Sequence, residues 1–443
     1  MKVKLYTLGC KVNQYETQEI TEDLLKNGFS VTLNDDEADV FVVNSCTVTA
    51  ESDRKTRQTV RHLKRNHPDS IVVLTGCMPQ AFPQMASELT AADVVIGNKD
   101  NISLVAKLKR FISNRERIVE INQHLSGEAF CGNPIYEFNE RTRAIVKIED
   151  GCDRFCSYCV IPYARGRVRS KPIEQIKSEV SVLADKGFSE IVLVGINLSA
   201  YGKDTGEKFY NAVAVACEND KIKRVRLGSL EPDHLTDEIL SNLAKCKKLC
   251  PQFHISLQSG CDNTLKRMNR HYTADEYYDL CKKLRENFAD CTLTTDIMVG
   301  FSGETDEDFN DTVEFAKKVG FEKIHIFPYS VREGTRAASF DGKIEKSVKE
   351  KRVAVLSQVA EELRSNFLKE QIGKTVEIIP ETKRDGDFVV IPPLRNADTV
   401  IITDDELDDI RSSYDDYDDD DDHCDESYAM TVMRRMMYRI GEK

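Results

Sequence analysis

The sequence predicts an α/β protein with a small parallel-sheet domain, followed by an open barrel of six β/α units and a divergent C-terminal segment. Two series of short apolar runs alternate with amphipathic helical stretches, and such alternation is typical of parallel sheets. The chain has 443 residues, enough for two or three domains with substantial cores. With 40% hydrophobic and 31% charged residues, its composition is that of an ordinary globular protein.

The first domain is expected over residues 1–128. Its predicted strands are the apolar runs at 3–9, 40–45, 71–76 and 93–97, and amphipathic helices are predicted at 13–28 and 52–66. Cys10, Cys46 and Cys77 directly follow the first three of these strands. Because the carboxyl ends of parallel strands meet at one edge of a sheet, where ligands bind, we expect the three thiols to lie together. Three separately buried structural thiols are the alternative.

Residues 129–140 are predicted to form a linker, and the barrel is expected over residues 141–368. Its predicted strands are the apolar runs at 143–151, 190–197, 224–232, 253–260, 292–301 and 323–330. The carboxyl ends of such strands form the working face of a parallel barrel. The residues at these ends that can do chemistry are Cys152, Cys156, Cys159, Gly195, Asn197, Ser229, Glu231, Gln258 and Gly300.

The strand–helix pattern weakens after residue 368. A partial domain with two β-like runs is expected over residues 369–403, and residues 404–443 are predicted to be a disordered tail. Residues 404–426 contain 14 acidic residues and one arginine, which accounts for the whole formal net charge of −13. The first residues lack the apolar run of a signal peptide, and no stretch approaches the length of a membrane span. We therefore expect a cytoplasmic protein with no membrane partner.

Cys152, Cys156 and Cys159 form a C-x3-C-x2-C pattern in a chain whose 14 cysteines show no disulfide framework. A structural zinc site uses four tetrahedral ligands, usually in two close pairs. Three thiolates on a [4Fe–4S] cluster instead leave one iron open to chelate a small ligand with amine and carboxylate groups. This spacing is characteristic of radical S-adenosylmethionine (SAM) enzymes, and a zinc loop is the alternative.

Over residues 1 to about 368 the chain resembles the radical SAM methylthiotransferases. The matching stretches are TLGCKVNQYE, VVNSCTV, LTGCMPQ, GCDRFCSYCVIPYARGRVRS, HISLQSG, LKRMNRHYT and FPYSVREGTRA. GCKVNQYE is most similar to the branch that acts on tRNA N(6)-threonylcarbamoyladenosine. The chain departs from the family at Ser302, where the family usually has proline. It also departs at its end, where only GKTVEIIPET matches the RNA-binding TRAM domain.

The resemblance implies two [4Fe–4S] clusters and SAM. Cys152, Cys156 and Cys159 would bind the cluster that holds SAM, and Cys10, Cys46 and Cys77 would bind an auxiliary cluster that handles the inserted sulfur. Tyr158 would lie near the adenine, and Gly195 and Asn197 near the methionine amino group. The weaker candidates for ribose, carboxylate or adenine contacts, with turns and caps as their alternative roles, are Ser229, Glu231, Gln258 and Gly300.

The activity implied by the resemblance is insertion of a methylthio group at C2 of N(6)-threonylcarbamoyladenosine at position 37 of tRNA. One SAM would methylate the sulfur, and another would generate the deoxyadenosyl radical. The partners would be tRNA, a sulfur donor and an electron donor such as flavodoxin or ferredoxin. Isopentenyladenosine of tRNA and a ribosomal-protein aspartate are alternative substrates, and a metal-dependent RNA-binding scaffold is the non-enzymatic alternative.

Two groups of arginines are candidates for contacts with RNA. Arg54, Arg57 and Arg61 recur at intervals of three or four residues, so they share one face of the predicted helix, and a merely solvated face is the alternative. Arg165, Arg167 and Arg169 directly follow the barrel cysteines. Cations of this kind bind backbone phosphates, while a target base in the anticodon loop must be unstacked before its carbon can be reached.

Overall fold

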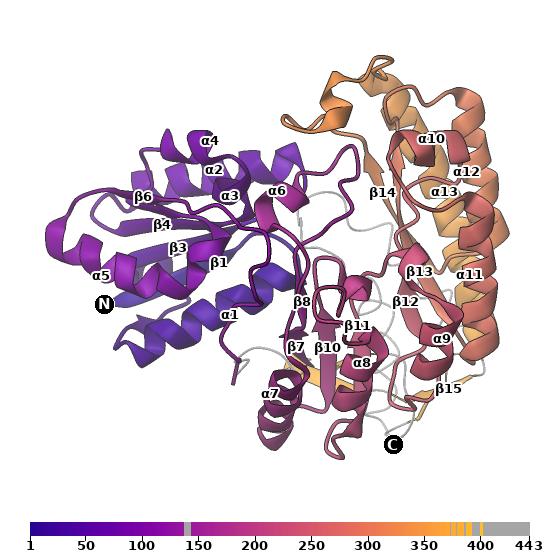
Figure 1. Ribbon diagram of the computed structural model, residues 1–443, viewed down its shortest axis with the longest axis horizontal. Coiled ribbons are helices and arrows are strands. Elements are labelled where there is room, and N and C mark those ends of the chain that lie inside the picture. Colours follow the sequence, from indigo (N-terminus) through magenta and orange to yellow (C-terminus); the bar gives the residue numbers. More distant parts are fainter. Residues whose placement is uncertain (137–142, 373, 378, 385–386, 392–398, 402–443) are drawn as a thin grey trace.

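The computed structural model describes residues 1–136, 143–372, 374–377, 379–384, 387–391 and 399–401. Two α/β bodies lie side by side, the first domain on the left of Figure 1 and the barrel on the right. The predicted fold class is confirmed. In the described part of the chain, no helix is both long and apolar enough to cross a bilayer.

The first domain is a fully parallel sheet of six strands in the order β2-β1-β3-β4-β5-β6. The strands are β1 (Lys2–Thr7), β2 (Ser30–Val31), β3 (Val40–Ser45), β4 (Ile71–Gly76), β5 (Val94–Ile96) and β6 (Ile118–Glu120). The helices are α1 (Lys11–Lys26), α2 (Ala50–Asn66), α3 (Cys77–Ala81), α4 (Pro83–Ser87) and α5 (Leu104–Asn114). The edge strands β2 and β6 were not predicted, since two or three residues are too short for a periodic pattern.

Helices cover both faces of this sheet. Apolar residues of α1 and α5 pack on one face, and those of α2, α3 and α4 pack on the other. The central strands β3 and β4 are therefore buried along their whole length. This explains why they read as continuous apolar runs in the sequence.

The barrel consists of two parallel three-stranded sheets, β11-β10-β7 and β12-β13-β14. Parallel bridges from Val225 to Leu249 and from Leu230 to Ile255 join them into one series of six strands. The strands are β7 (Arg143–Lys147), β10 (Glu190–Val194), β11 (Arg224–Leu227), β12 (Gln252–His254), β13 (Thr292–Val299) and β14 (Lys323–Pro328). A short antiparallel pair, β8 (Glu149–Asp150) and β9 (Arg169–Ser170), flanks the cysteine loop.

Helices surround the barrel strands on the outside. They are α7 (Ile173–Asp185), α8 (Phe209–Glu218), α9 (Asp237–Leu243), α10 (Asp262–Arg267), α11 (Ala274–Asn287), α12 (Asp306–Val319) and α13 (Lys346–Gln371). The short helix α6 (Ile161–Arg165) instead follows the cysteine loop and contacts α3 of the first domain. Capping boxes at Thr273 and Thr305 fix the starts of α11 and α12. Beyond α13, β15 (Thr375–Glu377) pairs with β18 (Thr399–Ile401), and β16 (Ile379–Arg384) pairs with β17 (Asp387–Ile391). The predicted tail at 404–443 lies outside the described residues.

The first domain packs against the inner face of the first half of the barrel. Along β7 and β10, alternate residues point outward into the helix-covered core, and the residues between them point inward. The inward side chains Ile145 and Val192 belong to one apolar cluster with Val12 and Tyr15 of α1. Ile135, within the predicted linker, is fully buried in the same cluster. Figure 1 shows α1 beside β7 at this junction.

Ser302, which stands where the family usually has proline, allows a test of how a buried hydroxyl affects stability. We expect Ser302→Ala to leave stability unchanged or to raise it slightly, because the buried Ser302 hydroxyl has no hydrogen-bond partner among the described residues. The control is Ser259→Ala. Ser259 is equally buried, but its hydroxyl bonds with Thr312 and accepts from the amide of Cys261, so its loss should cost about 1–2 kcal/mol. Thermal unfolding of anaerobically purified variants measures both effects, and a larger loss at Ser302 would contradict this interpretation.

Candidate functional site

The cysteines of the first domain lie at the carboxyl ends of three adjacent strands. Cys10 follows β1 and caps α1, Cys46 follows β3, and Cys77 is the first residue of α3 directly after β4. Because these strands are neighbours in the sheet, the three thiols meet at one edge. Gly9 has a φ of +146°, and a Cβ there would lie 2.8 Å from Cys46 Cβ, so a glycine is required for this close approach.

The electrostatics of this group are those of buried thiols close to one another. Burial and the neighbouring sulfurs raise the pKa of Cys46 to about 12. Burial likewise raises the pKa of Cys77 to about 11, although Arg165, whose Nε lies 3.1 Å from Cys77 Sγ, opposes the shift. Such thiols stay neutral unless a cation compensates their charge. Three converging sulfurs, two buried and the third, of Cys10, exposed, therefore fit a thiolate-bound metal cluster better than a free nucleophile.

The barrel cysteines lie in the loop between β8 and α6, at the carboxyl end of the barrel. N–H groups face the sulfur atoms: Asn197 Nδ2 lies 3.8 Å from Cys152 Sγ, and Arg270 Nη1 lies 3.4 Å from Cys156 Sγ. The amide of residue 161 lies 3.4 Å from Cys159 Sγ, and burial raises the pKa of this thiol to about 12. Donors aimed at sulfur stabilise thiolates that bind a metal cluster.

Two buried oxygens beside Cys152 point to a ligand that carries hydrogen-bond donors. The amide of Asn197 donates to Glu149 Oε2 at 2.7 Å, and a Cβ at Gly195 would lie 2.6 Å from the same oxygen. Glu149 Oε1 and Asn197 Oδ1 have no hydrogen-bond partner among the described residues. Burial raises the pKa of Glu149 well above its usual range. Since unpartnered buried oxygens are costly, an amino group bound here would satisfy both. This pair of acceptors thus fits the amino group of SAM beside a cysteine-bound cluster.

Glu231 forms an ion pair with Arg270. Its carboxylate accepts from Arg270 at 2.5 and 3.3 Å, while Arg154 Nη2 lies 3.8 Å away. Arg270 is buried and contacts Cys156, so it links this pair to the cysteine loop. Glu149, Arg154 and Arg270 were not predicted from the sequence. Glu149 and Arg154 flank Cys152 in IEDGCDRFC, and Arg270 lies in LKRMNR, within a stretch that matches the family, so these positions were the available signal.

The remaining predicted SAM residues occupy varied environments. Tyr158 packs edge-on against Phe301 with ring centroids 6.2 Å apart. Gln258 is half-buried beyond β12 with a φ of +67°, a strained conformation that often marks functional sites. Gly300 has a φ of +72°, and its amide donates to Glu304 at 2.6 Å. Ser229 is exposed just past β11.

The predicted RNA-binding arginines differ in their exposure to solvent. Arg165 has a relative exposure of only 1%, and Arg169 is also buried, where it donates to the carbonyls of Arg165 and Arg167. Neither side chain can reach a phosphate on the surface, which corrects the prediction for these two. Arg167 stays exposed and lies over the ring of Phe155. On α2, Arg54 and Arg61 are exposed and Arg57 is half-buried.

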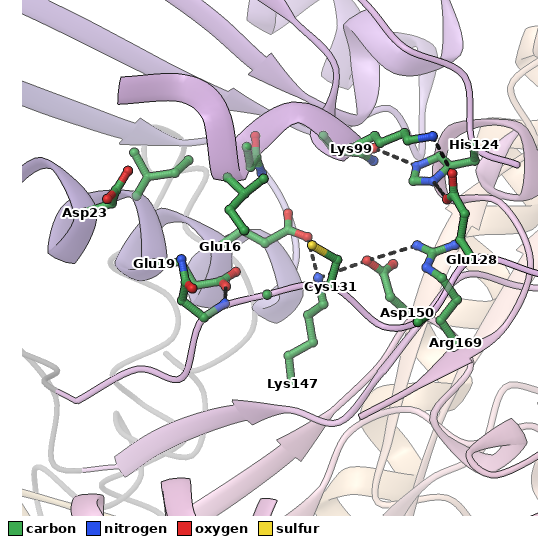
Figure 2. Close-up of a pocket in the computed structure, with 17 residues that line it drawn as sticks. Glu16, Glu19, Asp23, Lys99, His124, Glu128, Cys131, Lys147, Asp150 and Arg169 are labelled. Carbon is green, nitrogen blue, oxygen red and sulfur yellow. Dashed lines mark hydrogen bonds and ion pairs between the residues drawn. The ribbon is translucent and has the colours of Figure 1, made fainter. Parts of the chain in front are cut away.

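Arg165 instead joins the two domains. It forms a bidentate ion pair with Glu16 of α1, and Lys147 of β7 also donates to Glu16 at 2.8 Å. This network borders a cavity of about 290 Å³ between the domains, shown in Figure 2 with Asp150 and Arg169 on its barrel side. Because Arg165 also contacts Cys77, the pair fixes one cysteine group relative to the other.

A second ion pair joins the two domains, and its arginine comes from the loop after β14. Arg332 donates to Asp53 Oδ2 and to the carbonyl of Thr47, both at 2.8 Å, and all three residues are buried. Thr47 directly follows Cys46, so this contact positions the cysteine loop of the first domain against the far side of the barrel.

Comparisons with known proteins agree with this geometry. The family model described as Radical SAM superfamily matches residues 146–316, and Uncharacterized protein family UPF0004 matches residues 2–97. Among solved structures, radical S-adenosylmethionine methyltransferase TsrM from Kitasatospora setae superimposes with a TM-score of 0.57 at 15% identity, over 76% of this chain and 73% of that one. This likeness shows the fold. The barrel is therefore a radical SAM domain, a class that binds SAM and a [4Fe–4S] cluster.

Closer relatives cover nearly the whole chain. It is 38% identical to threonylcarbamoyladenosine tRNA methylthiotransferase MtaB of Aquifex aeolicus, over 86% of this chain and 92% of the relative. It is 33% identical to tRNA-2-methylthio-N(6)-dimethylallyladenosine synthase of Pelotomaculum thermopropionicum, over 91% of this chain and 92% of the relative. The protein belongs to the radical SAM methylthiotransferase family, which confirms the resemblance found in the sequence.

The junction between the domains can be tested with a matched pair of variants. Arg165→Met should lower stability by about 3 kcal/mol, because it leaves the buried Glu16 carboxylate with only Lys147 as a cationic partner. Arg167→Met, only two residues further along the chain but exposed, should change stability by less than about 0.5 kcal/mol. Adding Glu16→Gln to Arg165→Met should recover part of the loss. Thermal unfolding measures all three, and equal losses for the two single arginine variants would contradict the assignment.

Proposed function

We propose that the protein is a tRNA methylthiotransferase that inserts a methylthio group at C2 of N(6)-threonylcarbamoyladenosine at position 37. The observation that carries the proposal is the pair of cysteine groups at the carboxyl edges of two joined sheets, linked through Arg165 and Glu16. A scaffold protein has no need for two such groups. The names of the most similar relatives support tRNA as the substrate and favour the threonylcarbamoyl branch.

In this proposal each cysteine group binds one [4Fe–4S] cluster. Cys152, Cys156 and Cys159 hold the cluster that binds SAM, and Cys10, Cys46 and Cys77 hold the second. When bound, these cofactors supply the carbon radical and the sulfur, because an aromatic C–H is too weakly acidic for a polar route. The protein binds and orients the reactants and excludes water.

Specific side chains carry out this positioning. Glu149 and Asn197 accept hydrogen bonds from the SAM amino group, and Arg270 holds Glu231 beside the cluster loop. Tyr158, fixed by Phe301, borders the adenine. The candidate phosphate contacts are the accessible arginines of α2 and of the cysteine loop: Arg54, Arg57, Arg61 and Arg167. The chemistry also requires a sulfur donor and an electron donor such as flavodoxin or ferredoxin.

The modified nucleosides of a gene-deletion strain test the substrate. Mass spectrometry of digested tRNA should show loss of 2-methylthio-N(6)-threonylcarbamoyladenosine and accumulation of its unthiolated precursor, with the wild-type gene restoring both. Complementation with the Cys152→Ala variant should restore neither. Loss of the methylthio form of isopentenyladenosine instead, or no change in either nucleoside, would overturn the proposed substrate.

The two cysteine groups should have separable roles. Replacing Cys10, Cys46 and Cys77 together by alanine should halve the iron of the reconstituted protein, from about eight to about four atoms. This variant should still cleave SAM to deoxyadenosine but should form no methylthio product. Replacing Cys152, Cys156 and Cys159 should abolish both reactions, while Cys131→Ala, at an exposed cysteine outside both groups, should change neither. Stoichiometric zinc without iron would contradict the cluster assignment.

A further inference from the structure

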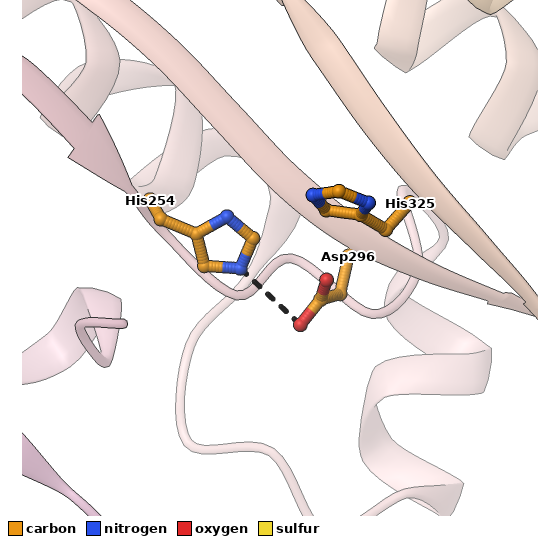
Figure 3. A group of neighbouring side chains, drawn as sticks. All are labelled: His254, Asp296 and His325. Atoms are coloured by element: carbon orange, nitrogen blue, oxygen red, sulfur yellow. Dashed lines mark ion pairs between the residues drawn. The ribbon is translucent and has the colours of Figure 1, made fainter. Parts of the chain in front are cut away.

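The inner face of the barrel has two halves of different character. On β7 and β10 it is apolar and is covered by α1 of the first domain. On β12, β13 and β14 it presents three half-exposed polar side chains, His254, Asp296 and His325, one from each strand. Figure 3 shows the three side chains grouped together. Their ligating atoms all lie within 4.8 Å of one another.

These three side chains form an ordered polar group. His254 Nε2 donates to Asp296 Oδ2 at 3.2 Å, and His254 Nδ1 lies 3.0 Å from Thr294 Oγ1. Asp296 is opposite His325 in the strand register, and the two imidazole ring centroids are 5.8 Å apart. Although burial opposes it, the hydrogen bond from His254 and the nearby His325 and Arg270 lower the pKa of Asp296. The group therefore offers both hydrogen-bond donors and a fixed acceptor.

The strand residues on either side of this group along the barrel differ in character. Two residues before His254 on β12, the side chain of Gln252 accepts from Arg226 at 2.8 Å, and Arg226 also donates to the buried Glu190 at 2.9 Å. Toward the carboxyl ends, Met298 is half-buried and Phe327 is exposed. Arg270, which contacts Cys156, is among the charges that lower the pKa of Asp296, so the group lies toward the cysteine loop. We call His254, Asp296 and His325 the floor of this half of the barrel.

We propose that this floor binds the carboxylate-bearing N6 substituent of the substrate adenosine, with His325 donating to the carboxylate and Asp296 holding His254 in place. The proposal rests on the proposed function and names the site that selects the substrate. A threonylcarbamoyl group carries a carboxylate, a hydroxyl and N–H groups, all of which can pair with this floor. A dimethylallyl group carries only carbon and hydrogen, so it would displace water from these half-exposed polar side chains without offering a hydrogen bond in return.

The same three residues could also ligate a divalent cation, since two histidines and a carboxylate are a common metal-binding set. Both ring nitrogens of His254 already have protein partners, at 3.0 and 3.2 Å, so a metal would have to displace at least one of these hydrogen bonds. The geometry therefore favours the hydrogen-bonding role, and a metal requirement is an outcome that the test can detect.

The test compares two synthetic anticodon stem-loop RNAs, one with threonylcarbamoyladenosine and one with its methyl ester, which removes the negative charge. Wild-type holoenzyme should have a kcat/KM at least about tenfold higher for the acid, as expected for a hydrogen bond to a charged group. His325→Leu should lower kcat/KM for the acid about tenfold and for the ester less than about threefold. His325→Gln, which keeps an N–H donor, should retain part of the preference.

The control is His67→Leu, the same substitution at a histidine that packs on Phe41 at the end of α2, and it should keep the wild-type ratio. Equal iron content establishes that each variant is folded and loaded. If wild-type enzyme converts the acid RNA but His325→Leu lowers both substrates equally, the site assignment fails while the proposed function stands. If wild-type enzyme converts neither RNA, the proposed function itself fails. Activity lost on chelation and restored only by Mn²⁺ or Zn²⁺, in wild type but not in His325→Leu, would assign the group to a metal and overturn the proposal.

Discussion

The buried ion pair between Arg165 and Glu16 is the contact on which the arrangement of the two domains depends. A charge without a partner at this depth would be prohibitively costly, so the guanidinium and the carboxylate must stay together whenever the domains are docked. Arg165 is the last residue of α6, the helix after the barrel cysteines, and Glu16 belongs to the helix that starts next to Cys10. One interaction thereby ties the two cysteine groups into a single unit.

A second ion pair and a hydrogen bond join Arg332, near the end of the barrel sequence, to the segment after Cys46. Together with the apolar contact of α1 on the inner face of β7 and β10, they hold the first domain over one half of the barrel. The other half carries the floor formed by His254, Asp296 and His325. Two domains held in this way are suited to radical chemistry, because they bring reactants together from two sides and limit the access of water.

Two of the unsatisfied buried polar atoms lie where a ligand would complete them. Glu149 Oε1 and Asn197 Oδ1 lie beside Cys152, and both are buried without a partner in the described part of the chain. The energetic cost of leaving them unpaired is avoided when an amino group binds. The same principle underlies selectivity at the barrel floor, where polar side chains favour a substituent that can hydrogen-bond with them.

The sequence by itself determined the fold class, the two groups of cysteines and the membership of the methylthiotransferase family. Strand periodicity and the positions of Cys10, Cys46 and Cys77 at strand ends are local properties, so they can be read along the chain. Only the tertiary structure decided that Arg165 and Arg169 are buried rather than exposed to RNA, because burial depends on α1, which is more than a hundred residues away in the sequence. It likewise brought together His254, Asp296 and His325, which sequence reasoning did not select. Their proximity arises from the pairing of separate strands, and the spacing of residues within one strand carries no record of the register between strands.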